Sequence, residues 1–235
     1  MTSVGEAPET GTEHDLLARL RAELPRALPS ALTVAGPSPS AGNDLYESFL
    51  FALVLRAARA EGYEVSFANR TGQAPREFRL RRSPGRLPTG EFTHAILTLP
   101  GTGKDPLEVH TGVAVIGMSK VAHEADVLVL PMSDAQRCRQ LRIDPPSRDA
   151  ELVVEGKYYT TPLALGMGRQ FLGLTADLSG EVVKILAATV TSQSVVHLLS
   201  GRKKLFEVGV LPGRKAERDL QERFAQALRA YRQGL

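Results

Sequence analysis

The chain of 235 residues contains no tryptophan, one cysteine and only 6% aromatic residues. The single cysteine, Cys138, excludes an internal disulfide framework and any cysteine-rich zinc site. No apolar run approaches the roughly 18 residues that a membrane-spanning helix needs. The N-terminal stretch MTSVGEAPETGTEHD is too acidic and polar for a secretory signal. We therefore expect a cytoplasmic protein.

The remaining composition is that of a globular chain, with 43% hydrophobic and 23% charged residues. A chain of this length can bury one full hydrophobic core. We expect a flexible N-terminal tail at residues 1–13 and a single domain at residues 14–235. The core of that domain is predicted at residues 43–190, with an N-terminal helix before it and a helical extension after it.

Positive charge is concentrated in two parts of the sequence, although the net charge is only +3. Eight arginines lie between Arg56 and Arg86, and nine lysines or arginines stand against four acidic residues from Arg202 onward. Basic segments of this kind can follow a phosphate backbone, and they are equally typical of solvated helix faces. On the first interpretation, the phosphate or DNA contacts include Arg81, Arg82, Lys203 and Lys204.

Hydrophobic periodicity predicts an α/β protein in which a mixed β-sheet is flanked by helices. Leucine spacing and helix-boundary residues indicate helices at residues 14–28, 43–62, 162–178, 194–201 and 215–233. Apolar, β-branched runs bounded by glycine and proline indicate strands at residues 63–69, 92–100, 107–117, 125–131, 151–159 and 181–190. The arginine- and proline-rich stretch between the first two strands is expected to form a loop.

Two short motifs suggest nucleotide binding or acyl transfer, but neither is complete. PGTGKDP, residues 100–106, lacks the upstream glycine of a P-loop, and Asp105 replaces the serine or threonine that reaches Mg²⁺. GMSKV, residues 117–121, has Val121 where a nucleophile elbow needs glycine. We interpret the first motif as a hairpin turn and Ser119 as a turn residue.

Acidic and histidine residues gather on two of the predicted strands. Glu108 and His110 are two positions apart on one strand, so they share a face. His123, Glu124 and Asp126 precede the buried run VLVLP, where a carboxylate needs a cation, a metal or a hydrogen-bond donor. Zinc hydrolysis through His110 and His123 is conceivable, but no H-E-x-x-H or similar ligand spacing supports it. His123 and Glu124 fit equally well as turn residues.

The stretch ELVVEGKYYTT, residues 151–161, places two opposite charges inside an apolar run. Strand alternation puts Glu155 and Lys157 on one face and Gly156 on the other. The pair fits an exposed ion pair, and it also fits an active site. In an active site, a carboxylate and an ammonium on a rigid strand can bind Mg²⁺ and stabilise charge on a phosphate.

These residues, taken in order, resemble the PD-(D/E)XK nucleases, the restriction-endonuclease-like superfamily. Asp126 stands at a strand start, Glu-x-Lys lies on the following strand, and Arg169 and Gln170 lie on the next helix. The predicted elements follow the helix, three strands, helix, strand core of that family. Glu47 stands on an otherwise apolar face of the first core helix, where family members often carry a glutamate.

The sequence departs from the family pattern in two places. Ala125 precedes Asp126, whereas the family loosely retains a proline there. A connection of 28 residues separates Asp126 from Glu155. We expect an inserted helix and loop in this connection, and the two acids can meet only if their strands are neighbours.

The resemblance implies a metal-dependent endonuclease that hydrolyses DNA phosphodiester bonds with Mg²⁺, for which Mn²⁺ can substitute. The implied metal ligands are Asp126, Glu155 and Glu47. The other implied catalytic residues are Lys157, which would orient the attacking water, and Gln170, which would act on the scissile phosphate with Arg169. Residues expected to support the ligands through hydrogen bonds are Glu108, His110 and His123.

Two other functions remain open from the sequence. A catalytically silent domain of this fold could bind nucleic acid or a partner protein in a defence or repair system. A metal-dependent hydrolase could act on RNA or another phosphoester. Cutting both DNA strands commonly favours a dimer in this family, so the expected partners are DNA and a second copy of the chain.

Overall fold

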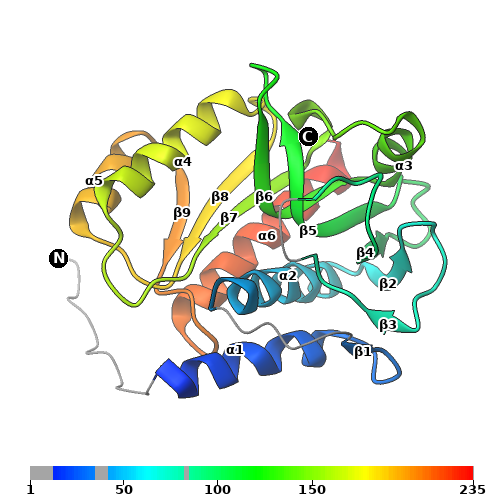
Figure 1. Ribbon diagram of the computed structural model, residues 1–235, viewed down its shortest axis with the longest axis horizontal. Helices are drawn as coiled ribbons and strands as arrows, with labels where there is room; N and C mark the ends of the chain where they lie inside the picture. Colours follow the sequence, from blue (N-terminus) through cyan, green and yellow to red (C-terminus); the bar gives the residue numbers. More distant parts are fainter. Residues whose placement is uncertain (1–12, 35–41, 82–84, 235) are drawn as a thin grey trace.

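The computed structural model describes residues 13–34, 42–81 and 85–234. Arg82 and most of the expected N-terminal tail, residues 1–12, lie outside the described residues. The centre of the molecule is a seven-stranded sheet (Figure 1). Across the sheet the strands are β2 (Glu64–Asn69), β4 (Thr93–Thr98), β5 (Leu107–Ile116), β6 (Ala122–Pro131), β7 (Leu152–Lys157), β8 (Val183–Ala188) and β9 (Leu205–Val208).

The sheet is mixed and mostly antiparallel. Neighbouring strands are antiparallel from β2 to β7, and β7, β8 and β9 run parallel. Parallel neighbours need a crossover, and helices provide both: α4 (Leu165–Asp177) joins β7 to β8, and α5 (Gln193–Gly201) joins β8 to β9. The predicted α/β class, with a mixed sheet flanked by helices, is confirmed.

Helices cover both faces of the sheet. Successive residues of β6 point to opposite faces of the sheet. Val127 and Val129 belong to one cluster of buried side chains, and Leu128 and Leu130 belong to another on the opposite face. The first cluster includes buried residues of three helices: α1 (Glu13–Ala27), α2 (Gly42–Ala60) and α6 (Lys215–Gln233). The opposite face packs against α4, α5 and α3 (Met132–Leu141).

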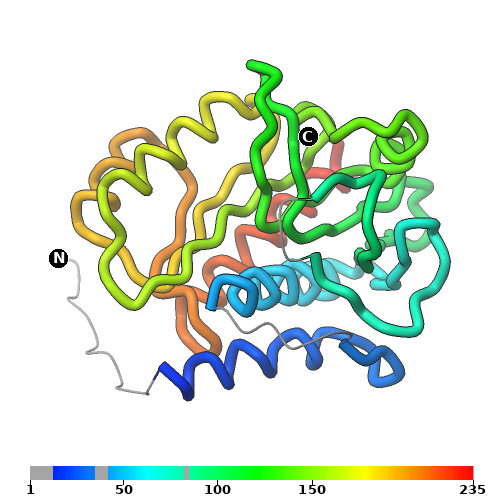
Figure 2. The backbone as a smooth tube through the Cα atoms, in the orientation of Figure 1, coloured from blue at the N-terminus to red at the C-terminus, as the bar shows by residue number. Residues whose placement is uncertain are grey.

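The α2 helix is buried on nearly every side. Its sequence LYESFLFALVL carries apolar residues all round, which is typical of a helix inside a core rather than on a surface. The two terminal helices, α1 and α6, are far apart in sequence and both pack against α2 (Figure 2). The first residues of α2 therefore have a fixed position relative to the sheet, and Glu47 is among them.

The hairpin of β5 and β6 extends beyond the neighbouring strands (Figure 1). Its register runs from Leu107 opposite Pro131 to Ile116 opposite Ala122, whereas β7 pairs with β6 only from Val127 to Val129. The prediction that Asp126 opens a strand is therefore wrong. Because β6 pairs with β5 from Ala122 onward, the strand begins four residues before Asp126. Asp126 therefore lies inside β6, next to the last residue of β6 that pairs with β7.

Other predictions about the fold have mixed outcomes. The motif at residues 100–106 joins the antiparallel strands β4 and β5, so the hairpin turn is confirmed, as is Ser119 in the β5–β6 turn. The inserted helix between β6 and β7 is confirmed as α3. Three short strands were not predicted: β9, β1 (Thr33–Val34) and its parallel partner β3 (Glu77–Phe78). Within the described ranges, no helix is long and apolar enough to cross a membrane.

Candidate active site

A polar pocket of about 240 Å³ opens between the sheet and α4. Two adjacent strands and one helix supply its walls. The lining residues are His123, Glu124 and Asp126 from β6, Glu155 and Lys157 from β7, and Gln170, Phe171 and Leu174 from α4. Four of the five predicted catalytic residues thus line one pocket.

Asp126 lies where β6 and β7 separate. The last backbone pair between these strands is Val127 with Val154, and beyond it the Asp126 carboxylate accepts a hydrogen bond from the Gly156 N–H, at 2.6 Å. The residue is only 8% exposed. Burial and the negative charge of Glu155 raise the pKa of Asp126 to about 7, against the opposing effects of Lys157 and the Gly156 N–H.

Glu155 and Lys157 form an ion pair, with Lys157 Nζ 2.5 Å from Glu155 Oε1. Both side chains are about one-fifth exposed, so they reach the solvent in the pocket. Burial would lower the pKa of Lys157, but Glu155 and Asp126 outweigh burial and raise it. The lysine is therefore a cation at neutral pH, as charge stabilisation on a phosphate requires.

Gly156 allows a close approach between β7 and α2. A Cβ atom at this position would lie 2.7 Å from Leu50 Cδ1, inside van der Waals contact, and 3.4 Å from the Tyr46 ring. Asp126 Oδ2 would lie 3.5 Å from that Cβ, which is an ordinary contact distance. The glycine therefore matters for the packing of β7 against α2.

Glu124 also lines the pocket; the sequence placed it in the acidic and histidine group before VLVLP but not among the catalytic residues. It stands two positions before Asp126 on β6, so both carboxylates share a face. Burial and the charge of Glu155 raise the pKa of Glu124. The pocket therefore contains three carboxyl groups and one ammonium group, an excess of acid that a divalent cation would neutralise.

Glu47 lies near this group although it does not line the pocket. Burial, together with the nearby charges of Asp126, Glu124 and Asp44, raises the pKa of its side chain to about 8, against the opposing effect of Lys157. Across the described residues, the Glu47 carboxylate makes no hydrogen bond or ion pair. It is thus a half-buried acid that interacts electrostatically with the acids of the site.

His123 is held in the pocket by Asp177, the last residue of α4. One Asp177 oxygen accepts hydrogen bonds from His123 Nε2 and Ser119 Oγ, each at 2.6 Å, and the other accepts from the Ser119 N–H at 2.8 Å. Hydrogen bonds from Ser119 and His123 lower the pKa of Asp177 to about 2. The β5–β6 turn is thereby tied to α4. Ser119 and His123 do not contact each other as a nucleophile and its base would.

The residues predicted to contact phosphate or DNA do not gather around the pocket. Arg169 is exposed on α4 beside Gln170 but does not line the pocket. Lys203 and Lys204 precede β9, at the amino-terminal end of the parallel strands, whereas Lys157 ends β7 at the carboxyl end. The guanidinium of Arg81 is 3.8 Å above the Phe92 ring and donates to a backbone carbonyl, so its side chain is used in packing.

A larger cleft of about 480 Å³ lies beside β2 and β4. Arg70, Arg76 and Arg79 line it together with Glu77 and Glu91. Arg79 is shared between these two glutamates, at 3.3 Å from each. Both acids of the cleft are paired with Arg79, and the cleft contains none of the predicted catalytic residues, so the smaller pocket is the stronger candidate site.

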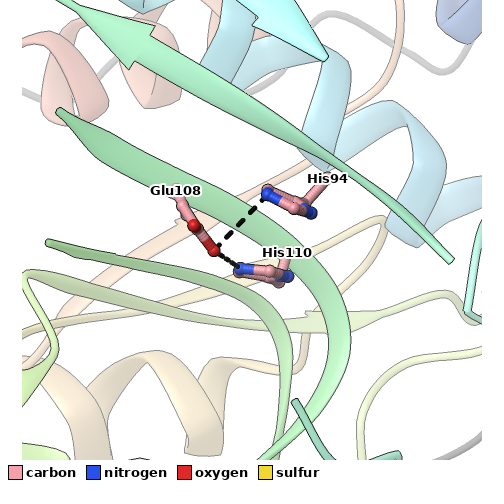
Figure 3. A group of neighbouring side chains, drawn as sticks. All are labelled: His94, Glu108 and His110. Carbon is pink, nitrogen blue, oxygen red and sulfur yellow. Dashed lines mark hydrogen bonds and ion pairs between the residues drawn. The ribbon is translucent and has the colours of Figure 1, made fainter. Parts of the chain in front are cut away.

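Glu108 and His110 belong to a separate, buried cluster with His94 of β4 (Figure 3). His110 Nε2 and His94 Nε2 lie 2.8 and 3.5 Å from Glu108 Oε2. Arg139 of α3 donates to both oxygens of the same carboxylate, at 2.7 and 2.6 Å. None of these residues lines the candidate pocket, so the predicted supporting role of Glu108 and His110 has no contact to act through.

This cluster is also the one place, within the described part of the chain, where three metal-ligating groups lie within 4.8 Å of one another. Burial would raise the pKa of Glu108, but hydrogen bonds from Arg139, His110 and His94 outweigh burial and keep it far below its usual range. Burial lowers the pKa of His110 to about 4, despite the opposing effect of Glu108. At neutral pH the glutamate is ionised and the imidazole is neutral.

Comparison of the chain with protein-family models, with curated proteins and with solved structures gives no match.

Proposed function

We propose that the pocket is the active site of a Mg²⁺-dependent nuclease that hydrolyses phosphodiester bonds in DNA. The observation that carries the proposal is the meeting of Asp126, Glu155, Lys157 and Gln170 around one 240 Å³ pocket. These residues come from β6, β7 and α4, and a structural ion pair needs only two of them. A chance occurrence of Glu-x-Lys on a strand would not bring the other two to the same place.

The donor set fits a hard cation. Mg²⁺ takes oxygen ligands, typically from one or two carboxylates, and keeps several waters. Asp126 and Glu155 would bind it, and Glu124 of the same pocket and the neighbouring Glu47 would hold its waters. When bound, the ion would supply a polarised phosphate and a more acidic water.

Side chains of the pocket would fill the other roles in the reaction. Lys157 is the last residue of β7 and lines the pocket. Its ammonium group would stabilise the hydroxide nucleophile and the charge that develops on the phosphate. Gln170 lines the opposite wall and would hydrogen-bond a non-bridging phosphate oxygen. Phe171 and Leu174 provide the apolar part of the wall, which limits the water around the reacting group.

The arrangement of elements also supports a restriction-endonuclease-like core. The buried helix α2 precedes the antiparallel strands β5, β6 and β7, and the crossover helix α4 leads to β8, which is parallel to β7. This is the order of helix, three strands, helix and strand that the sequence resemblance implies. In this assignment the additions to the core are the strands β1, β2, β3, β4 and β9, the helices α3 and α5, and the two terminal helices.

The test is cleavage of supercoiled plasmid DNA with Mg²⁺ or Mn²⁺ by the wild type and by Lys157→Ala. We expect the variant to fold and bind metal but to lose about 10²–10³-fold in rate, because an electrostatic contact to the transition state is removed. Lys104→Ala is the matched control, since Lys104 is an exposed lysine on the β4–β5 turn. Full activity in Lys157→Ala would rule out the assigned role.

The same assay separates the other two functions. A binding domain without activity would retard DNA in a gel and leave the plasmid intact with either metal. A hydrolase of another phosphoester would spare the plasmid and cleave RNA or a small diester in a substrate panel. Either result from the wild type would replace the present proposal.

A further inference from the structure

A histidine and an aspartate meet in the wall of the candidate pocket. His123 of β6 lines the pocket, and its Nε2 lies 2.6 Å from Oδ2 of Asp177, the last residue of α4. Hydrogen bonds from Ser119 and His123 lower the pKa of Asp177 to about 2, so its carboxylate is ionised at neutral pH and only accepts hydrogen bonds. His123 therefore carries a proton on Nε2.

The other ring nitrogen of His123, Nδ1, is accessible. It makes no hydrogen bond with a residue that the structure describes. Unlike Nδ1 of His94 and of His110, it is not buried, and the His123 side chain is 23% exposed. The imidazole is thus held by Asp177 at one nitrogen and open at the other. A ring held in this way can exchange a proton through Nδ1 without losing its orientation.

The turn between β5 and β6 makes room for this pair. A Cβ atom on Gly117 would collide with the Asp177 carboxylate and lie 3.0 Å from His123 Nε2, so a larger residue would push the two side chains apart. Ser119 donates to both Asp177 oxygens, at 2.8 Å from its N–H and 2.6 Å from its Oγ. These bonds already tie the turn to α4, so that link does not require an imidazole.

The proposed reaction needs a proton donor for the leaving oxygen, and the other residues of the pocket are poorly suited to this role. The carboxylates would be ionised beside a bound cation. Burial would lower the pKa of Lys157, but Glu155 and Asp126 outweigh burial and raise it, so the lysine retains its proton. The glutamine and the apolar residues of the wall have no acidic proton to give. An imidazole both holds and releases a proton near neutral pH.

We propose that His123 is the general acid of the reaction and that Asp177 positions it; this assignment rests on the proposed phosphodiester hydrolysis. A water oxygen forms a bond to phosphorus, and the bond from phosphorus to the leaving oxygen breaks. The leaving oxygen keeps the electron pair and takes the proton from Nδ1 of the imidazolium. The attacking water releases its proton to solvent, and neutral His123 regains a proton from solvent before the next turnover. The Asp177 carboxylate stabilises the imidazolium throughout.

The test compares two oligonucleotide substrates that differ in the leaving atom. One is an ordinary phosphodiester, and the other has sulfur in place of the bridging oxygen that the product ends show to leave. A thiolate is a far weaker base than an alkoxide and leaves without a proton donor. His123→Gln keeps an N–H for Asp177 but has no acidic proton. We expect this variant to lose about 10²–10⁴-fold in rate on the oxygen substrate and to cleave the sulfur substrate at nearly the wild-type rate.

Ser119→Ala is the matched control, because it removes a hydrogen bond to the same Asp177 oxygen and leaves the imidazole in place. It should show the wild-type ratio of sulfur to oxygen rates, with each rate measured in the same metal. Equal losses by His123→Gln on both substrates, or no loss on either, would overturn the role of His123 while leaving an active nuclease. A wild type that cleaves neither substrate with Mg²⁺ or Mn²⁺ would overturn the proposed function and the role of His123 with it.

Discussion

At the scale of single residues, Asp126 shows how the candidate site opposes the stability of the fold. Its carboxylate is nearly buried, faces the acids Glu155 and Glu124, and has one backbone N–H as a fixed donor. A carboxylate in such surroundings takes up a proton more readily than it does in the unfolded chain. Perturbed acids of this kind are typical of functional sites, where binding groups are held ready at a cost in stability.

This cost can be measured with Asp126→Asn. The folded pKa of about 7 exceeds the unfolded value of about 3.9, so the wild type loses stability as pH rises through that range. Asparagine keeps an oxygen for the Gly156 N–H and carries no charge. We expect the metal-free variant to be more stable than wild type at pH 8, by on the order of 2–4 kcal/mol.

Thermal unfolding in the presence of a chelator, at pH 5 and at pH 8, provides the measurement for Asp126→Asn. The gain should shrink at pH 5, where the wild-type acid is protonated. Asp219→Asn, which changes an exposed acid paired with Lys215, should show no such pH-dependent gain. A variant that melts below wild type at pH 8 would mean that Asp126 stabilises the fold as an anion.

At the scale of elements, the sequence predicted the parts that depend on local pattern. Strand alternation placed Glu155 and Lys157 on one face, and their ion pair at the pocket agrees with it. The requirement that the strands of Asp126 and Glu155 be neighbours is met by β6 and β7. The shared face of Glu155 and Lys157 was predictable because side-chain direction in a strand follows from the period of two.

Other parts of the site depend on contacts between segments far apart in sequence. Asp177 holds His123 across 54 residues, and nothing near either residue indicates the pair. His94 meets Glu108 and His110 only through the register of β4 with β5. Glu124 could have been found, because it stands two positions before Asp126, but that requires knowing that β6 begins before both. Strand register and strand ends are set by the whole sheet rather than by local residues.

The contact between α2 and β7 gives a prediction at this scale. Gly156→Ala would place a methyl group 2.7 Å from Leu50 Cδ1, inside a core where Leu50 is fully buried. Overpacking of this kind costs about 1–3 kcal/mol. The strand would also move away from the helix and take Lys157 with it. We expect a lower midpoint in urea unfolding and a lower rate of plasmid cleavage.

Gly173→Ala is the matched control for this change. Gly173 lies inside α4, and a Cβ atom there would meet no other atom within 4 Å. Alanine in a helix interior is favoured over glycine by roughly 0.5–1 kcal/mol, so this variant should be slightly more stable than wild type. If Gly156→Ala behaved like Gly173→Ala, the close approach of α2 to β7 would not constrain the site.

At the scale of the whole molecule, two groups of buried charges limit stability at opposite ends of the pH range. In the histidine cluster, the pKa of His110 is about 4 in the folded chain and about 6.5 in the unfolded chain. The unfolded chain therefore takes up the proton first, and stability falls as pH drops from about 6.5 to 4. Glu108 acts in the same direction, because its lowered pKa favours the fold only while it is ionised.

Asp126 in the candidate pocket and Glu47 near it act at the other end. With pKa values of about 7 for Asp126 and about 8 for Glu47, the folded chain retains protons that the unfolded chain has released, so stability falls as pH rises toward 8. A divalent cation bound by these acids would remove the repulsion between them. We therefore predict that Mg²⁺ raises the melting temperature of wild type at pH 8 and has little effect at pH 5.

The measurement is a series of melting curves from pH 4 to 8.5, with Mg²⁺ and with chelator. Because Mg²⁺ leaves the histidine cluster unchanged, the acid side of the profile should be the same in both. Equal stabilisation by Mg²⁺ at pH 5 and pH 8 would show that the ion binds elsewhere on the chain.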